Sequence, residues 1–128
     1  MLRHLAPDAG PPGPARLAEI WLQIISAPGR SLLLAVGDDD PIGTVDLVLV
    51  PNLTHGARPR LLAGNLVVAP EHRRRGVATA LLAAAVSHAE ANACYEIQLL
   101  SDGRRTTAHP LFEAAGFTAN ATGHTRRL

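Results

Sequence analysis

Hydrophobic residues near the start of the chain recur at helical spacing. Within 14–26 an apolar side chain returns every three or four positions, Pro14 suits a first helical position, and Pro28 followed by Gly29 ends the run. This pattern predicts an amphipathic helix over 14–26 whose apolar stripe belongs to the core. The stripe consists of Leu17, Ile20, Trp21, Ile24 and Ile25.

The spacing then changes to that of β-strands. Residues 31–36 and 42–50 are rich in Leu, Val and Ile and flank a polar segment at 37–41, which predicts a β-hairpin. Residues 51–60 show no periodicity and contain Asn, Thr, Gly, Pro and His, so they predict a loop. A further apolar run at 61–69 predicts a third strand.

Helical and strand patterns alternate in the second half of the chain. After a polar turn at 70–76, residues 77–93 are dense in Ala and Leu and free of Gly and Pro, which is strong helix composition. A short apolar run at 95–100 predicts a strand, and 106–115 predicts a helix that Gly116 ends.

This order of elements predicts one α/β domain. A hairpin followed by a strand, a helix and another strand implies a mixed, mostly antiparallel sheet flanked by helices, with a crossover to a parallel neighbour. A length of 128 residues suits a single domain over 1–128, and residues 1–13, rich in Pro and Gly, read as a loose lead-in.

Composition and charge exclude several classes of protein. The formal net charge is +1, so no global field draws the chain onto nucleic acid or an anionic membrane, and no apolar run is long enough to span one. The single Cys94 and the absence of an apolar leader predict a cytoplasmic protein without disulfides. The six His residues show no metal-ligand spacing, which predicts no metal site.

The turn before the long helix carries the chemistry of an anion site. At the start of a helix, backbone N–H groups lack intrahelical partners and the helix dipole favours negative charge. Gly76 lets the backbone approach a ligand closely, Ala78 keeps that clearance, and Arg73, Arg74 and Arg75 supply counter-charge. These residue types suit a pyrophosphate, although a solvated basic turn is the alternative reading.

At these residues the chain resembles the GNAT superfamily of N-acetyltransferases. The acetyl-CoA loop of that family reads Arg or Gln, two residues, Gly, one residue, then Gly or Ala, and here the matching residues are Arg73, Gly76 and Ala78. The resemblance covers roughly residues 31–117 in order, ending with Phe112 and the Gly-Phe pair at 116–117.

The resemblance implies a fold and a co-substrate. The fold would be a GNAT-type domain with a V-shaped splay between its fourth and fifth strands and a shortened N-terminus, in which residues 2–5 would form the first strand. The co-substrate would be acetyl-CoA, its pantetheine arm pairing like a strand with the backbone of Val67 and Val68. The implied cofactor-binding residues are Leu66, Val67, Val68, Arg73, Arg74, Arg75, Gly76, Val77, Ala78, Thr79 and Phe112.

The implied activity is acetyl transfer to a primary amine of a small molecule by direct attack in a ternary complex. The N–H of Val68 would stabilise the oxyanion. The chain departs from the family at two points: Asn65 stands near the place of a common Glu and could at most hold a water, and Phe112 replaces a Tyr that protonates the thiolate. Ser101 and His109 are the substitute candidates, His109 also having a structural reading as a polar group at a helix start.

Two questions of function stay open from the sequence. Because Asn65 and Phe112 remove the usual acid–base pair, the alternative is a catalytically weak or silent acyl-CoA-binding module. Loop 51–60 is the expected place of acceptor recognition, with Asn52, His55 and Arg58 among its polar candidates. The resemblance also implies a possible homodimer that pairs through residues 118–128.

Overall fold

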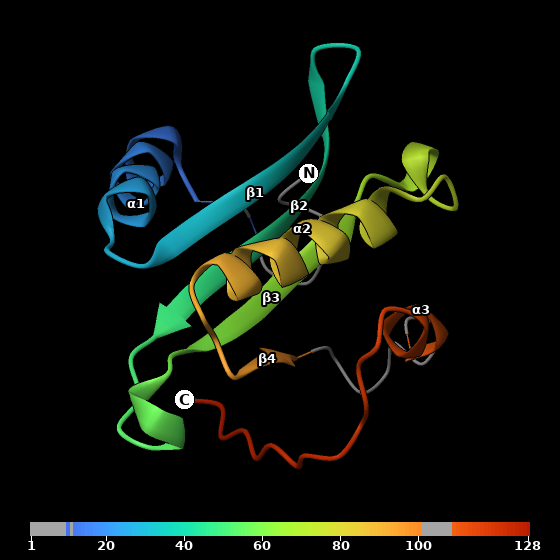
Figure 1. The fold of residues 1–128 in the computed structure, drawn as a ribbon. Helices are drawn as coiled ribbons and strands as arrows, with labels where there is room; N and C mark the ends of the chain where they lie inside the picture. Colours follow the sequence, from blue (N-terminus) through green and yellow to red (C-terminus); the bar gives the residue numbers. More distant parts are fainter. Residues whose placement is uncertain (1–9, 11, 101–108) are drawn as a thin grey trace.

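The architecture is a four-stranded sheet with helices on both faces (Figure 1). This computed structural model describes residues 10, 12–100 and 109–128. The elements are α1 (Pro14–Ser26), β1 (Arg30–Gly37), β2 (Asp40–Val50), a 3-10 turn η2 (His55–Ala57), β3 (Arg60–Val68), a 3-10 turn η3 (Pro70–His72), α2 (Val77–Ala91), β4 (Glu96–Leu99) and α3 (His109–Ala114).

The strand order follows the sequence, β1-β2-β3-β4, and confirms the predicted mixed sheet. β1 and β2 form the predicted hairpin, β2 and β3 are also antiparallel, and α2 makes the crossover that places β4 parallel to β3. Each predicted element within the described residues is present, with bounds that differ by at most three residues. The expected first strand at 2–5 lies outside the described residues.

The main core lies between the sheet and α2. Because side chains alternate along a strand, one face of β2 and β3 presents Val45, Leu47, Leu61 and Ala63 toward α2, where Leu81, Ala85 and Ala89 complete the cluster. Gly43 lets the start of α2 come close, since a Cβ at this position would lie 3.0 Å from the side chain of Val77. This packing fixes where α2 begins relative to the end of β3.

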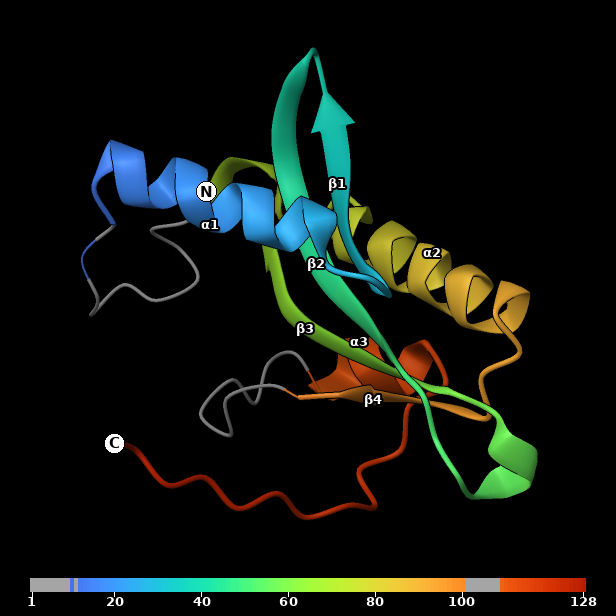
Figure 2. The same cartoon turned by 90° about the vertical axis from the view of Figure 1, so that its left-hand side faces the viewer.

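Helix α1 lies on the opposite face of the sheet from α2 and packs chiefly on β1 (Figure 2). None of its residues is buried, and Trp21 is 44% exposed. The expectation that its whole apolar stripe is core was therefore wrong: Ile20 and Ile24 are half-buried, whereas Leu17, Trp21 and Ile25 are exposed. Too little of the molecule covers this helix, within the described residues, to enclose a stripe that wide.

A partly buried ion pair supports the face beneath α1. Arg30 Nε of β1 donates to Asp46 Oδ1 of β2 at 3.0 Å, and this hydrogen bond raises the pKa of the Arg30 guanidinium above its ordinary value. Asp46 is only 8% exposed, so the bidentate pairing satisfies a carboxylate that burial would otherwise penalise.

Two further properties bear on function. No helix among the described residues is long and apolar enough to cross a membrane. Residues 117–128 adopt no helix or strand, and all but Phe117 are exposed. The pairing of two copies through this segment stays a prediction.

Candidate active site

Strand β4 pairs with only the first four of the nine residues of β3. The parallel pairing runs from Arg60 with Glu96 to Ala63 with Leu99, and one more hydrogen bond joins the Leu100 N–H to the Ala63 carbonyl at 3.4 Å. Beyond Ala63, β3 continues to Val68 without β4 beside it (Figure 1). If residues 2–5 formed a first strand, β3 and β4 would be the fourth and fifth strands. The V-shaped splay predicted between these two strands stays a prediction.

A bulge at Asn65 decides which backbone groups face this gap. The register between β2 and β3 shifts between Thr44 and Asp46, and Asn65 has a φ of 51°, so the bulged strand carries one extra residue there. The Ala69 N–H donates to the Ile42 carbonyl of the β2 strand at 2.8 Å. Since backbone groups alternate along a strand, Val67 also turns toward β2.

The residues that face the gap are Leu66 and Val68. Their N–H and C=O groups point away from β2, on the side where β4 has ended; we call these groups the open edge of β3. Val67, which the sequence placed in the pairing, is 4% exposed and sits in the ladder with Thr44. An extended ligand added beside β3 would therefore pair with Leu66 and Val68 rather than with Val67.

The turn at 73–76 has the backbone shape of an anion-binding nest. Arg74 has a φ of 61° and Gly76 a φ of 80°, while Arg75 between them has no positive φ. Alternation of left-handed and right-handed residues directs successive N–H groups into one concavity. A Cβ on Gly76 would meet nothing within 4 Å, so the space in front of the turn is open.

Helix α2 starts at this turn and adds its own unpaired donors. The N-cap is Gly76, and the first helical hydrogen bond joins the Ala80 N–H to the Gly76 carbonyl at 3.0 Å. The N–H groups of Val77, Ala78 and Thr79 precede that bond and point along the axis toward the 73–76 turn. Together with the helix dipole they favour a phosphate group at this position.

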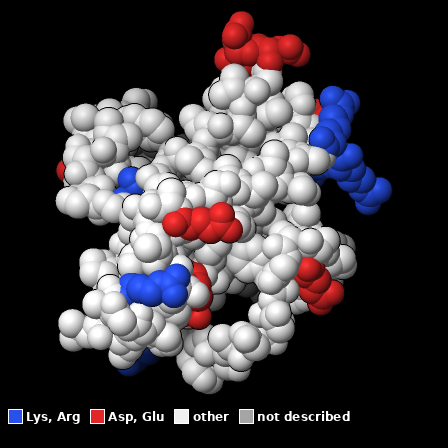
Figure 3. Space-filling model, in the orientation of Figure 1, with Lys and Arg blue, Asp and Glu red and all other residues white. Residues whose placement is uncertain are grey.

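The charge distribution also favours a phosphate group at the start of α2. Basic atoms gather where α2 begins, while acidic atoms gather at the tip of the β1–β2 hairpin (Figure 3). Arg73, Arg74 and Arg75 are exposed, and Arg73 Nε donates to the Val68 carbonyl at 3.1 Å. With a net charge of +1, this cluster is a local rather than a global source of attraction for an anion.

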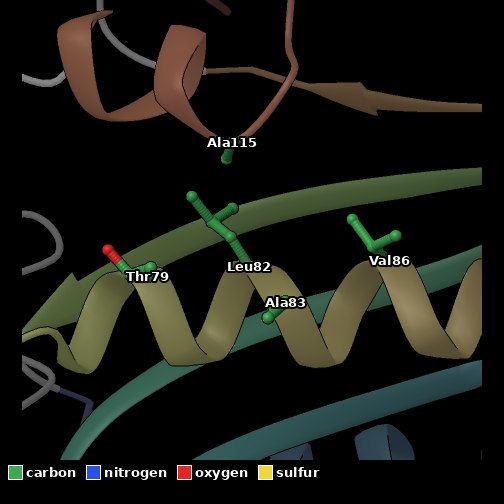
Figure 4. A pocket seen from close by; sticks show the side chains of 5 residues that line it. All are labelled: Thr79, Leu82, Ala83, Val86 and Ala115. Atoms are coloured by element: carbon green, nitrogen blue, oxygen red, sulfur yellow. The ribbon is translucent and has the colours of Figure 1, made fainter.

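An apolar pocket lies close to the turn, between α2 and α3. Its volume is about 250 Å³, and its lining residues are Thr79, Leu82, Ala83, Val86 and Ala115. Figure 4 shows Ala115 opposite Leu82, with Thr79 at the end of the pocket nearer the start of α2. Of these residues, only Thr79 was predicted from the sequence to line a site. Ala and Leu on nearly every side of the 77–91 segment were the signal, because a helix apolar all round needs partners on more than one side.

The described candidates for acid–base chemistry lie on two elements, β3 and α3. Asn65 is exposed at the bulge, next to the open edge of β3. His109 is exposed at the start of α3, and Phe112 is half-buried in the same helix. Ser101 lies outside the described residues. The structure thus brings Asn65 to the open edge.

Other titratable groups do not form a catalytic cluster. Burial raises the pKa of the Cys94 thiol above its ordinary value, which disfavours the nucleophilic thiolate. Among the described residues, no group of three or more His, Cys, Asp and Glu side chains is placed to hold a metal ion.

Loop 51–59 lies away from this site. It precedes β3, whereas the 73–76 turn follows it, and nine strand residues at about 3.3 Å each separate the two by roughly 25–30 Å. The loop instead packs against the start of β4: the His55 ring stacks on Tyr95 at 3.9 Å, and Arg58 Nε donates to the Ala93 carbonyl at 3.0 Å. The expected role of this loop in acceptor recognition stays a prediction.

Comparison with known proteins agrees with this geometry. Residues 1–117 match the sequence model of the Acetyltransferase (GNAT) family. No curated protein matches the chain.

Solved structures share the fold over nearly the whole chain. A protein from Agrobacterium tumefaciens strain C58 that is named as an acetyltransferase is 28% identical with a TM-score of 0.94, covering 99% of this chain and 88% of its own. An acetyltransferase from Trypanosoma brucei is 26% identical with a TM-score of 0.85, covering 99% and 87%. Aminoglycoside N-acetyltransferase AAC(6')-Iy, solved with CoA, is 26% identical with a TM-score of 0.80, covering 98% and 82%.

Proposed function

Because the chain belongs to the acetyltransferase (GNAT) family, we propose that it transfers an acetyl group from acetyl-CoA to a primary amine of a small molecule, by direct attack in a ternary complex. The chain is an N-acetyltransferase, and acetyl-CoA is its co-substrate. The observation that supports the proposed reaction is the juxtaposition of the 73–76 turn with the open edge of β3, both at the C-terminal end of that strand.

The residues present fit the co-substrate. Its pyrophosphate suits the N–H groups of the 73–76 turn and of Val77, Ala78 and Thr79, with the open space before Gly76 admitting the phosphate oxygens. Its pantetheine amides suit the free backbone groups of the open edge, in which the Val68 carbonyl already accepts from Arg73 Nε. The apolar pocket begins at Thr79, one helical turn from Gly76, and suits an apolar part of the same molecule.

Acetyl-CoA supplies a thioester that is activated toward amines. The chain would orient the reacting carbonyl along the open edge of β3, where the N–H of Val68 would donate to its oxygen. An alkyl amine has a pKa of about 10.4, so the acceptor must lose a proton before attack. Asn65 is adjacent and could hold a water that takes this proton, while Ser101 and His109 remain proposals for the same task.

The acceptor class is proposed to be an amino sugar or a related small amine. AAC(6')-Iy has also been solved with a bisubstrate analogue, CoA-S-monomethyl-acetylneamine, and that protein is 25% identical to the chain with a TM-score of 0.78. This neighbour makes amino sugars the first group to test.

A second candidate is a silent acyl-CoA-binding module. It is favoured by Asn65 at the bulge and Phe112 in α3, since neither side chain can give or take a proton. The two candidates share the cofactor site and differ only in turnover.

The test is a thiol-release assay with acetyl-CoA against amino sugars, alkyl amines and peptides. The variant is Gly76→Glu, which puts a side chain and a negative charge in the open space before the turn; the control is Arg58→Ala, on the distant loop 51–59. We expect turnover with the unaltered chain and the control, and none with Gly76→Glu. A melting temperature raised by CoA without thiol release would select the silent module, and no effect of CoA would contradict both candidates.

A further inference from the structure

Arg73 makes a contact that separates it from the two arginines that follow. Its Nε donates to the Val68 carbonyl at 3.1 Å, so the side chain reaches back across η3 to the last residue of β3. Its own N–H donates to the Pro70 carbonyl at 3.4 Å, which closes the same short segment from the backbone. Among the described residues, Arg74 and Arg75 make no side-chain hydrogen bond of this kind.

The accepting carbonyl lies on the open edge of β3. Val68 points away from β2, and β4 ends its pairing at Ala63, so no strand among the described residues satisfies this carbonyl. The Arg73 guanidinium donates the hydrogen bond to this carbonyl that a neighbouring strand would otherwise provide. The contact therefore ties the beginning of the 73–76 turn to the strand that carries the other half of the site.

We propose that Arg73 is a positioning residue, which fixes the nest of N–H groups at 73–76 relative to the open edge of β3 through this hydrogen bond. The inference rests on the proposed function, because both halves must grip one extended ligand at once. The counter-charge for the ligand comes from Arg74 and Arg75. The contact also occupies the Val68 carbonyl, which leaves the Val68 N–H and both groups of Leu66 for pairing with the ligand.

The chemistry of the contact distinguishes this role from that of a counter-charge. The acceptor is an uncharged carbonyl, so what the site needs from residue 73 is an N–H donor of sufficient length. A phosphate counter-ion would instead need the positive charge itself. Arg73→Gln keeps a donor and removes the charge, whereas Arg73→Met removes both at a similar length.

The experiment measures the dissociation constant of coenzyme A by calorimetry at several salt concentrations. The variants are Arg73→Gln, Arg73→Met and, as the matched loss of charge on the same turn, Arg74→Met. We expect Arg73→Gln to bind within about twofold of the unaltered chain and Arg73→Met to bind about tenfold more weakly with an unchanged salt dependence. Arg74→Met should weaken binding and flatten the salt dependence.

Two outcomes would overturn the proposal. One is equal loss of affinity in Arg73→Gln and Arg73→Met with a flattened salt dependence in both, which would make residue 73 a counter-charge. The other concerns hydrogen–deuterium exchange measured without ligand. There we expect faster exchange at 74–79 in Arg73→Met than in the unaltered chain, and no such change in Arg73→Gln. Equal exchange in all three proteins would show that the contact fixes nothing. Because the exchange measurement needs no ligand, it tests the role of Arg73 even if the unaltered chain does not bind coenzyme A and the proposed function is wrong.

Discussion

Single residues in left-handed conformation shape two turns at the same end of the sheet. Gly76 and Arg74 shape the 73–76 turn, and Asp38 and Asp39 form the two-residue turn of the hairpin, with φ of 49° and 70°. Only glycine adopts such angles without cost, and other residues lose roughly 1 kcal/mol. In the 73–76 turn the strained backbone directs N–H groups into one concavity, whereas in the hairpin turn the strain lies at an exposed tip.

Gly76→Ala should lower the free energy of unfolding by about 1 kcal/mol, because its φ of 80° disfavours any Cβ. The added methyl meets no protein atom within 4 Å, so the loss is conformational and not steric. Gly64→Ala is the matched control, since it also meets open space but has no positive φ. Urea denaturation of both variants measures the difference, and equal losses would contradict the explanation.

Asp39→Gly should stabilise the protein by about 0.5–1 kcal/mol. Hairpin turns of this length favour glycine at the second position, and the change also removes one of three adjacent negative charges. Asp40→Asn separates the two causes, because it removes a like charge where φ is not positive. A gain in Asp40→Asn that equals the gain in Asp39→Gly would show that charge repulsion, and not backbone strain, is responsible.

At the scale of elements, the β2–β3 connection makes contacts that the sequence did not predict. The pattern identified loop 51–60 correctly as irregular and polar, and its polar side chains suggested acceptor recognition. Their partners are the Ala93 carbonyl and the Tyr95 ring, which are distant in sequence, so no local pattern could reveal that these side chains fasten the loop to the start of β4. Polarity alone does not separate a binding loop from a structural one.

Arg58→Ala should therefore change stability and leave substrate kinetics alone. Arg58 donates to the Ala93 and Cys94 carbonyls at 3.0 and 2.8 Å, and hydrogen bonds from a charged donor contribute about 1.5–3 kcal/mol where burial is complete. Because Arg58 is exposed, we expect a smaller loss of about 1 kcal/mol. The KM for the acceptor should stay within about twofold, and a large rise in KM would return acceptor recognition to this loop.

At the scale of the whole molecule, the periodicity of the chain predicted the hairpin and the crossover, since each depends on local patterns joined by short connections. The 73–76 turn was also predictable, because its glycine, its arginines and the following helix are contiguous in sequence. The open edge was not. It depends on where β4 stops and on a one-residue bulge at Asn65, and both are set by packing between distant segments.

Coenzyme A should stabilise the folded chain in a salt-dependent way. A ligand that binds only the folded state adds about 2.7 kcal/mol at a hundredfold excess over its dissociation constant, which a rise in melting temperature measures. The attraction comes from a local cluster of exposed arginines and from helix N–H groups, and exposed charges are screened strongly as the Debye length falls from about 10 Å at 0.1 M salt to 3 Å at 1 M.

The rise in melting temperature at a fixed concentration of coenzyme A should therefore shrink steadily as salt is added. The melting temperature of the free chain should change much less, because its net charge is +1 and the ion pair of Arg30 with Asp46 is partly buried. A double variant, Arg74→Gln with Arg75→Gln, should show a smaller shift that responds weakly to salt. A shift that is independent of salt in the unaltered chain would mean that the apolar pocket between α2 and α3, and not the arginine turn, provides most of the affinity.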